Sequence, residues 1–258
     1  MKIGWCEAGG LGRVELAREV GYDFVELALW PLKIEDPDAL RVARKAAAAS
    51  PIPTLVWGNF YPKDLRIVDP GVDVQRLRSY LHLAADFLHE VGAEVAVMGS
   101  AWTRNLAEGG DPVRAEAQLI QTLEWASDAF KGTGITCGLE PQNHLECNFI
   151  RTVRQGVEIV RKVNRDNIRV TADFWHIRME DEPLESLRDG APWICHVQLA
   201  DSERLNPGSG SFPLDALMRN LKAGGYQGNV SVECMMELPQ SAMRQSLALL
   251  RREAAIFA

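Results

Sequence analysis

Short apolar runs alternate with longer segments of helical periodicity along the whole chain of 258 residues. In one such segment, residues 74 to 91, apolar side chains recur from residue 77 at steps of three and four residues, which is typical of one face of an α-helix. Similar segments at 113–130, 152–163 and 241–256 predict further helices. Strands that alternate with helices predict βα units and a parallel sheet. The expected strands are residues 2–6, 24–28, 54–57, 94–98, 135–140, 168–173, 193–198 and 230–233.

Two architectures share this alternation, the open doubly wound sheet and the closed barrel. No GxGxxG or GxxxxGK[ST] motif follows the first strand, where "EAGGLGRVE" is only a loose glycine cluster. Polar residues gather instead at the ends of successive strands, and a closed parallel barrel brings all of those ends to one face. A chain of 258 residues is also close to the roughly 250 residues of such barrels. We therefore expect an α/β fold, a single (β/α)₈ TIM barrel, with residues 1–258 forming one domain.

The charge and hydropathy of the chain argue against two classes of partner. A formal net charge of −7 disfavours a surface that binds the phosphate backbone of nucleic acid, since such surfaces carry excess Lys and Arg. No run of about 18 or more apolar residues is present, so we expect no membrane span. The N-terminus enters a strand directly, and the five cysteines form no CxxC pair. We expect a cytoplasmic protein with reduced cysteines.

Four apolar runs in the second half of the chain each end on a side chain that carries oxygen. "ITCGLE" ends on Glu140, "IRVTAD" on Asp173, "WICHVQ" on Gln198 and "NVSVE" on Glu233. Consecutive members are one βα unit apart, so a barrel would place all of them at the same mouth. An all-oxygen ligand set suits Mn²⁺ or Mg²⁺ better than Zn²⁺. We expect one divalent metal ion, Mn²⁺ first and Mg²⁺ second. The alternative is that each residue is an ordinary polar group bonded to a neighbouring loop.

Longer motifs around these positions resemble a known family. "LEPQNHLE" contains Glu140, "DFWH" begins at Asp173, and "HVQLADSERLNPGSG" contains Gln198. Together with Glu233, they are similar to the xylose isomerase-like barrels, in particular the sugar isomerase and epimerase branch with D-tagatose 3-epimerase, L-ribulose-5-phosphate-type epimerases and hydroxypyruvate isomerase. The resemblance implies that Glu140, Asp173, Gln198 and Glu233 bind the metal. Many members carry His where this chain has Gln198, whereas hydroxypyruvate isomerases carry Gln.

The resemblance also implies an activity, that of a divalent-metal-dependent isomerase or epimerase acting on a keto sugar, a sugar phosphate or a small keto acid. Glu140 and Glu233 would be the acid/base pair that moves a proton next to the carbonyl, through an enediolate stabilised by the metal. Transfer on opposite faces would invert a stereocentre, and transfer on one face would interconvert aldose and ketose. The sequence leaves these outcomes open. The family likeness suggests a homodimer or homotetramer.

Substrate contacts are expected at Glu146, His176 and Arg204, which match positions that contact substrate oxygens in the family. Trp57 and Trp175, like Trp30 and Trp102, fall at or after strand ends. They could pack on the C–H faces of a sugar, or they could only seal the top of the barrel.

The glycine turn "NPGSG" follows the seventh strand, where barrels often hold phosphate. A phosphate or carboxylate on the substrate is one interpretation of it, and a purely structural turn is the one that we favour.

Two further polar residues belong to expected strands. Glu26 lies near the end of the second strand, and we expect it to form structural hydrogen bonds. His196 precedes Gln198 by two residues and therefore points to the same face. It could support Gln198, or it could be a buried structural histidine.

Two alternative functions share this scaffold. An endonuclease IV-like DNA-repair phosphodiesterase has the same fold and the D-x-x-H element, but it needs several zinc ions and more histidines at earlier strand ends. Here the third and fourth strands run into "VWGNF" and "VMGSA", and the chain has only five histidines. A lyase, dehydratase or deglycosidase could instead use the same site to expel a leaving group from an enolate.

Overall fold

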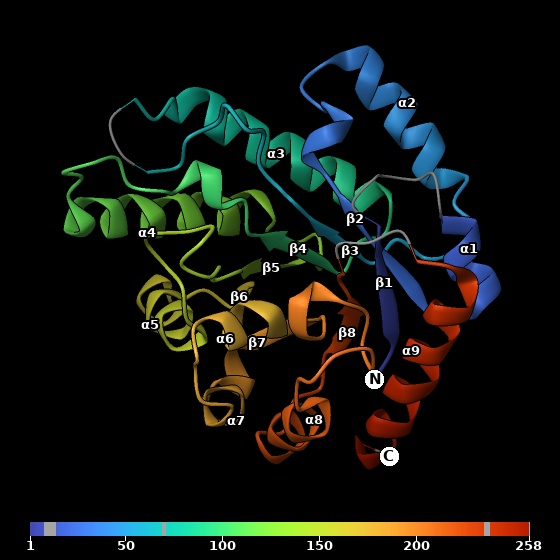
Figure 1. The fold of residues 1–258 in the computed structure, drawn as a ribbon. Coiled ribbons are helices and arrows are strands. Elements are labelled where there is room, and N and C mark those ends of the chain that lie inside the picture. The colour runs from blue at the N-terminus through green and yellow to red at the C-terminus, as the bar shows by residue number, and fades with distance from the viewer. Residues whose placement is uncertain (8–13, 69–70, 235–237, 258) are drawn as a thin grey trace.

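The chain folds into a closed barrel of eight parallel strands, each followed by at least one helix (Figure 1). The computed structural model describes residues 1–7, 14–68, 71–234 and 238–257. The strands are β1 (Ile3–Glu7), β2 (Phe24–Ala28), β3 (Val56–Gly58), β4 (Val95–Met98), β5 (Thr136–Leu139), β6 (Ile168–Asp173), β7 (Ile194–Leu199) and β8 (Asn229–Val232). They pair in chain order, and β1 pairs with β8 to close the barrel. The predicted (β/α)₈ fold is confirmed, and every strand end lies within two residues of its expected position.

Helices surround the barrel, as their apolar faces require. They are α1 (Val14–Val20), α2 (Pro37–Ala48), α3 (Val74–Glu90), α4 (Pro112–Ala129), α5 (Val153–Val163), α6 (Phe174–Met179), α7 (Glu185–Gly190), α8 (Leu214–Ala223) and α9 (Gln240–Ala254). Short 3₁₀ helices are η2 (Trp30–Leu32), η3 (Ala101–Thr103), η4 (Ala191–Trp193), η5 (Ser202–Arg204) and η6 (Ala255–Phe257). Within the described ranges, none of the helices is long and apolar enough to cross a membrane.

Capping side chains explain where the longer helices begin. Asp36, Asp73 and Asp111 each accept hydrogen bonds from backbone N–H groups of the first turn of α2, α3 and α4. Thr152 and Gln155 form a reciprocal capping box at the start of α5. Local sequence therefore determines where these helices begin, and with it the lengths of the loops that precede them at the barrel mouth.

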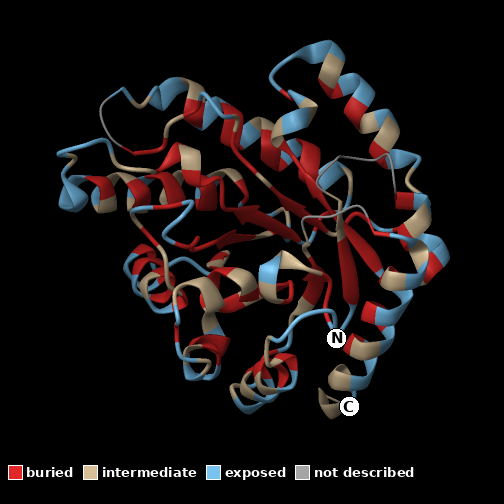
Figure 2. Ribbon diagram, viewed as in Figure 1, coloured by how far each residue is buried: buried red, intermediate tan, exposed pale blue. Residues whose placement is uncertain are grey.

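Alternate residues of the strands form two apolar layers. Phe24, Val56, Val95 and Val97 make a separate buried cluster inside the barrel, while their neighbours in sequence point outward. The outward residues pack against the helices in a larger core. Figure 2 shows that the strands are mostly buried and that the exposed residues lie on the outer sides of the helices. Phe24, Val56 and Val95 each begin a strand, so the inner cluster fills the N-terminal part of the barrel.

The opposite ends of the strands carry the polar residues singled out above. Glu140 directly follows β5, Asp173 ends β6, Gln198 is the last but one residue of β7, and Glu233 directly follows β8. Because all strands of the barrel are parallel, these ends meet at one mouth.

Candidate active site at the C-terminal mouth of the barrel

A cavity of about 220 Å³ opens at this mouth. It is lined by Cys6, Glu26, Leu27, Ala28, Gly58, Asn59, Trp102, Glu140, Gln142, Glu146, Gln198, Arg204, Glu233 and Cys234. Most of the residues that the sequence marks for function therefore share one small and polar space.

His176 joins two of the expected metal ligands beside this cavity. Its Nε2 lies 3.5 Å from Oε1 of Glu140 and 3.4 Å from Oδ2 of Asp173. One potential ligand atom from each of these three buried residues lies within 4.8 Å of the others, which is close enough to hold a metal ion. Among the described residues, this group contains two of the expected metal ligands, Glu140 and Asp173, but not Glu233.

The hydrogen bonds of Asn143 define which nitrogen of His176 carries the proton. Oδ1 of Asn143 accepts from the backbone N–H of Leu145 at 2.9 Å, so its Nδ2 faces Nδ1 of His176, 2.7 Å away. An N–H₂ group donates, so Nδ1 accepts, and the ring proton lies on Nε2, toward the carboxylates. Burial lowers the pKa of His176, but the negative charges of Asp173 and Glu140 raise it by more, so the net shift is upward. The N–H₂ group of Asn143 opposes a second ring proton on Nδ1, because that proton would replace the hydrogen bond.

Asp173 is held in place by its own helix. Its Oδ1 accepts from the backbone N–H of Trp175 at 2.7 Å and caps α6, which leaves Oδ2 buried without a hydrogen bond. Burial raises the pKa of Asp173, because the charged form loses its water. The free oxygen points to the same place as the proton of His176.

Gln198 is oriented by a buried network on neighbouring strands. Its Nε2 donates to Oε1 of Glu26 at 2.7 Å, while its Oε1 is buried and has no partner. Oε2 of Glu26 accepts from Ser231 at 2.5 Å and lies 3.1 Å from Nε2 of His196. The geometry agrees with the expected structural role of Glu26. His196 contacts Glu26 and Ser231, so it supports Gln198 only through them.

Arg204 bridges the acidic groups across the cavity. Its Nη2 lies 3.4 Å from Oε1 of Glu233 and 3.6 Å from Oδ2 of Asp173, and its Nη1 lies 3.3 Å from Oε1 of Glu146. Burial alone would lower the pKa of Arg204, yet Glu233, Asp173 and Glu146 raise it above its usual value. Burial also raises the pKa of Glu233. The carboxylates of Glu233 and Asp173 therefore both face the positively charged guanidinium of Arg204.

Several oxygens at this mouth lack a hydrogen bond. Oδ2 of Asp173, Oε1 of Gln198 and Oε2 of Glu233 are all buried without a hydrogen bond. One unsatisfied buried polar atom costs about 1–3 kcal/mol, so a group of them in one place needs an explanation. A bound divalent cation is one way to satisfy such oxygens, and carboxylate and amide oxygens are ligands that Mn²⁺ and Mg²⁺ accept. The residues present thus fit the expected metal.

Two supporting residues were not found from the sequence. A Cβ added at Gly99 would overlap Oε2 of Glu140, so this position must be glycine for the carboxylate to lie where it does. Arg104 is fully buried and donates to the carbonyl oxygens of Gly99 and Glu140, which ties the ends of β4 and β5 together. The only sequence signal for Gly99 is its position directly after a strand.

The tryptophans divide between the cavity and the core. Trp57 points outward, where its ring packs on Phe87 with 5.3 Å between centroids, and it is fully buried beneath α3. The expected substrate contact of Trp57 therefore fails, because the alternation of β3 turns its side chain away from the mouth. Trp175 packs on Phe212 at 6.0 Å and does not line the cavity, whereas Trp102 does.

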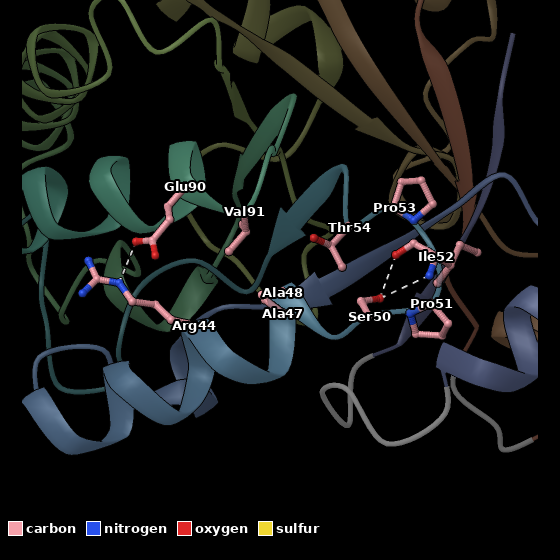
Figure 3. Close-up of a pocket in the computed structure, with 10 residues that line it drawn as sticks. All are labelled: Arg44, Ala47, Ala48, Ser50, Pro51, Ile52, Pro53, Thr54, Glu90 and Val91. Carbon is pink, nitrogen blue, oxygen red and sulfur yellow. Dashed lines mark hydrogen bonds and ion pairs between the residues drawn. The ribbon is translucent and has the colours of Figure 1, made fainter.

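A second hollow of about 410 Å³ lies at the other end of the barrel (Figure 3). It is formed by the ends of α2 and α3 and by the segment that leads into β3. Nε of Arg44 and Oε2 of Glu90 form an ion pair of 2.7 Å there. None of the residues expected to bind metal or substrate lines this hollow. The smaller cavity at the C-terminal mouth is therefore the candidate active site.

Comparison with known proteins agrees with this fold. The family model described as xylose isomerase-like TIM barrel matches residues 14–253. A putative hydroxypyruvate isomerase of Streptomyces coelicolor is 31% identical over 254 residues, 90% of this chain and 88% of that protein. The 3-dehydro-D-guloside 4-epimerase of Escherichia coli is 31% identical over 177 residues, 64% of this chain and 66% of that protein. The crystal structure of D-psicose 3-epimerase in the presence of D-fructose has a TM-score of 0.84 at 19% identity, covers 98% of this chain and 99% of that one, and shares the fold. The chain therefore belongs to the xylose isomerase-like TIM barrel family.

Proposed function

We propose that this protein is a divalent-metal-dependent isomerase or epimerase that acts on a small keto sugar or keto acid. The observation that carries the proposal is the gathering of buried ligand groups at this mouth. Glu140, Asp173 and His176 lie close enough to hold a metal ion. Glu140 also lines the cavity, together with Gln198 and Glu233, which each have a buried oxygen without a hydrogen bond. Relatives in the same family are named as a sugar 4-epimerase and a putative hydroxypyruvate isomerase, which supports the same reaction class.

Glu140, Asp173, Gln198 and Glu233 are the proposed metal ligands. His176 is a less suitable ligand, because the hydrogen bond from Asn143 puts the proton on Nε2, the nitrogen that faces Glu140 and Asp173. The donor set is then entirely oxygen, and we propose Mn²⁺ or Mg²⁺. When bound, the ion would supply Lewis-acid stabilisation of the negative charge that develops on the substrate carbonyl oxygen.

Glu140 and Glu233 are the proposed acid/base pair. They follow β5 and β8, which are not neighbours in the barrel, so their carboxylates reach the cavity from different sides. One can remove the proton from the carbon next to the carbonyl while the other returns a proton. Burial raises the pKa of Glu233, which favours its protonated form. Transfer between the two sides of a planar intermediate would invert a stereocentre.

His176, Glu146 and Arg204 are proposed to orient the substrate. The Nε2 proton of His176 and the guanidinium of Arg204 are donors beside the cavity, and they can hold carbonyl or hydroxyl oxygens. Glu146 lines the cavity and can accept a hydroxyl proton. A cytoplasmic location and a dimeric or tetrameric state stay predictions from the sequence.

Solvent exchange tests the proposal most directly. The protein is loaded with Mn²⁺ or Mg²⁺ and incubated in D₂O with a panel of ketoses and small keto acids, including hydroxypyruvate. We expect deuterium to enter at least one substrate at the carbon next to the carbonyl, as followed by NMR and mass spectrometry. Glu140→Gln should abolish exchange, whereas the exposed Glu158→Gln on α5 should retain it.

The alternatives predict other products. A lyase or deglycosidase would release a fragment, which the same spectra detect. An endonuclease IV-like enzyme would cut a DNA duplex that contains an abasic site. Incision of such a duplex with no deuterium uptake across the panel would overturn the proposal.

A further inference from the structure

The loop that follows β7 folds around the carboxylate of Asp201. Oδ1 accepts from the backbone N–H groups of Ser202 and Phe212, each at 2.8 Å, and Oδ2 accepts from that of Gly208 at 2.9 Å. Asp201 is only 1% exposed. Three backbone donors from an eleven-residue stretch, 202 to 212, thus converge on one anionic side chain.

Converging backbone N–H groups are the means by which proteins hold phosphate, and in barrels the loops after the seventh and eighth strands often do so. The "NPGSG" turn of this loop left that possibility open at the level of sequence. In the folded protein, the donors are taken by the chain's own carboxylate. A phosphate in the same place would have to displace Asp201 or lie against its negative charge.

The loop packs closely around Asp201. A Cβ added at Gly210 would overlap Oγ of Ser202 and lie 2.6 Å from Oδ1 of Asp201. Oγ of Ser202 itself accepts from the backbone N–H of Ser211 at 3.0 Å, so a fourth backbone donor of the loop is also used. The loop is closed around its own acceptor groups.

The positively charged side chain at the cavity, that of Arg204, already pairs with carboxylates. Among the described residues that line the cavity, Arg204 is the only Lys or Arg, and its guanidinium faces the carboxylates of Glu146, Glu233 and Asp173. Its charge is therefore already balanced by acidic groups. A phosphate dianion in the cavity would meet these carboxylates.

We infer, building on the proposed function, that the substrate carries no phosphate group and that Asp201 is the residue that determines this specificity. Its carboxylate fills the anion cradle after β7 and repels a phosphate from it. Sugar phosphates are thereby excluded from the substrates considered above, whereas free ketoses and unphosphorylated keto acids remain.

Matched pairs of substrates test the inference in the metal-loaded enzyme. D-fructose is compared with D-fructose 6-phosphate, D-ribulose with D-ribulose 5-phosphate, and hydroxypyruvate with its phosphorylated counterpart, by deuterium uptake from D₂O. We expect kcat/KM for the unphosphorylated member of an active pair to exceed that of its partner by at least about 100-fold, because like charges in one site repel strongly. Preference for a phosphorylated member would overturn the inference and leave the proposed function standing. Absence of exchange with every compound would remove both.

Variants of Asp201 test its role separately. Asp201→Gly removes the carboxylate and frees the three backbone donors, so inorganic phosphate should now raise the unfolding temperature and inhibit the enzyme. The wild type and a control variant of an exposed aspartate on α8, Asp215→Asn, should show neither effect. If Asp201→Gly does not fold, Asp201→Asn keeps an acceptor for Ser202 and Phe212 and should show a weaker response to phosphate. A folded variant that gains no phosphate response would overturn the assignment.

Discussion

The two ends of the barrel are built from the same strands, but one end is packed with apolar side chains and the other holds a polar cavity. Phe24 and Glu26 are two residues apart on β2 and face the same interior. Phe24 packs with other apolar side chains in the N-terminal half, and the edge of its ring meets that of His196 with 6.3 Å between centroids. Glu26 instead joins the polar network below the C-terminal mouth. Two residues along β2 thus separate the apolar part of the barrel, which stabilises the fold, from the polar part at the proposed active site.

The difference shows where the stability of this fold comes from. At the mouth, burial raises the pKa values of Asp173 and Glu233, which means that their charged forms are disfavoured by the fold at neutral pH. The apolar end has no such penalty, and burial of its side chains favours folding. We expect substitutions at the mouth to remove activity with little loss of stability, and substitutions at the opposite end to do the reverse.

Glu140→Gln should have the largest effect of all. It removes a proposed base and a proposed metal ligand while it preserves shape, and we expect kcat/KM to fall by at least about 10³-fold, since a general base alone contributes about 10²–10⁴-fold. The midpoint of chemical denaturation should change little. Steady-state kinetics on an active ketose and urea titration measure the two quantities. Retention of more than about a tenth of the activity would contradict the proposed role.

Phe24→Ala should have the next largest effect, and on stability. Phe24 is fully buried in the inner cluster with Val56, Val95 and Val97, so truncation should lower the free energy of unfolding by about 3–5 kcal/mol. Urea denaturation measures the change. Metal affinity of the protein that remains folded should stay within a few-fold of wild type. Loss of metal affinity without loss of stability would break the comparison between the two ends.

Glu26→Gln tests the boundary between the apolar and the polar end of the barrel. Oε1 of Glu26 accepts from Nε2 of Gln198, and an amide in its place can present an N–H group that no longer fixes the orientation of Gln198. We expect metal affinity to fall by about 10- to 100-fold, as for other residues that orient metal ligands. Activity should recover at high metal concentration, which distinguishes a positioning residue from a catalytic one. Calorimetric titration with Mn²⁺ provides the affinity, and Glu94→Gln at the exposed N-terminal side is the control. An unchanged affinity would contradict this role.

The sequence was sufficient for the fold because the fold depends on periodicity. Strand and helix patterns predicted every strand to within two residues, and strand-end positions placed Glu140 and Gln198 at one cavity. The error at Trp57 has the same origin. A residue at a strand end points in or out according to its register, and a shift of one residue in the expected end of β3 reverses the direction.

Other parts of the site depend on contacts between residues far apart in the chain. Arg104 supports Glu140 through backbone carbonyls, and Gly99 is required only because a side chain from the next strand lies over it. Neither contact leaves a periodic or spacing signal in the sequence. The orientation of Gln198 likewise depends on Glu26, 172 residues away. Such tertiary contacts become visible only in three dimensions.

Arg44→Met should have the smallest effect and completes the comparison. Arg44 and Glu90 form an ion pair of 2.7 Å beside the larger hollow, but their side chains are 41% and 53% exposed. An exposed pair contributes about 0–1 kcal/mol, and methionine keeps most of the apolar stem, so the free energy of unfolding should fall by less than about 1 kcal/mol. Neither kcat/KM nor metal affinity should change, because the hollow lies at the opposite end of the barrel from the proposed ligands. Urea denaturation and steady-state kinetics check both expectations. A loss of activity at this distance would mean that the two ends are energetically coupled through the strands, and the division of labour along β2 would then be incomplete.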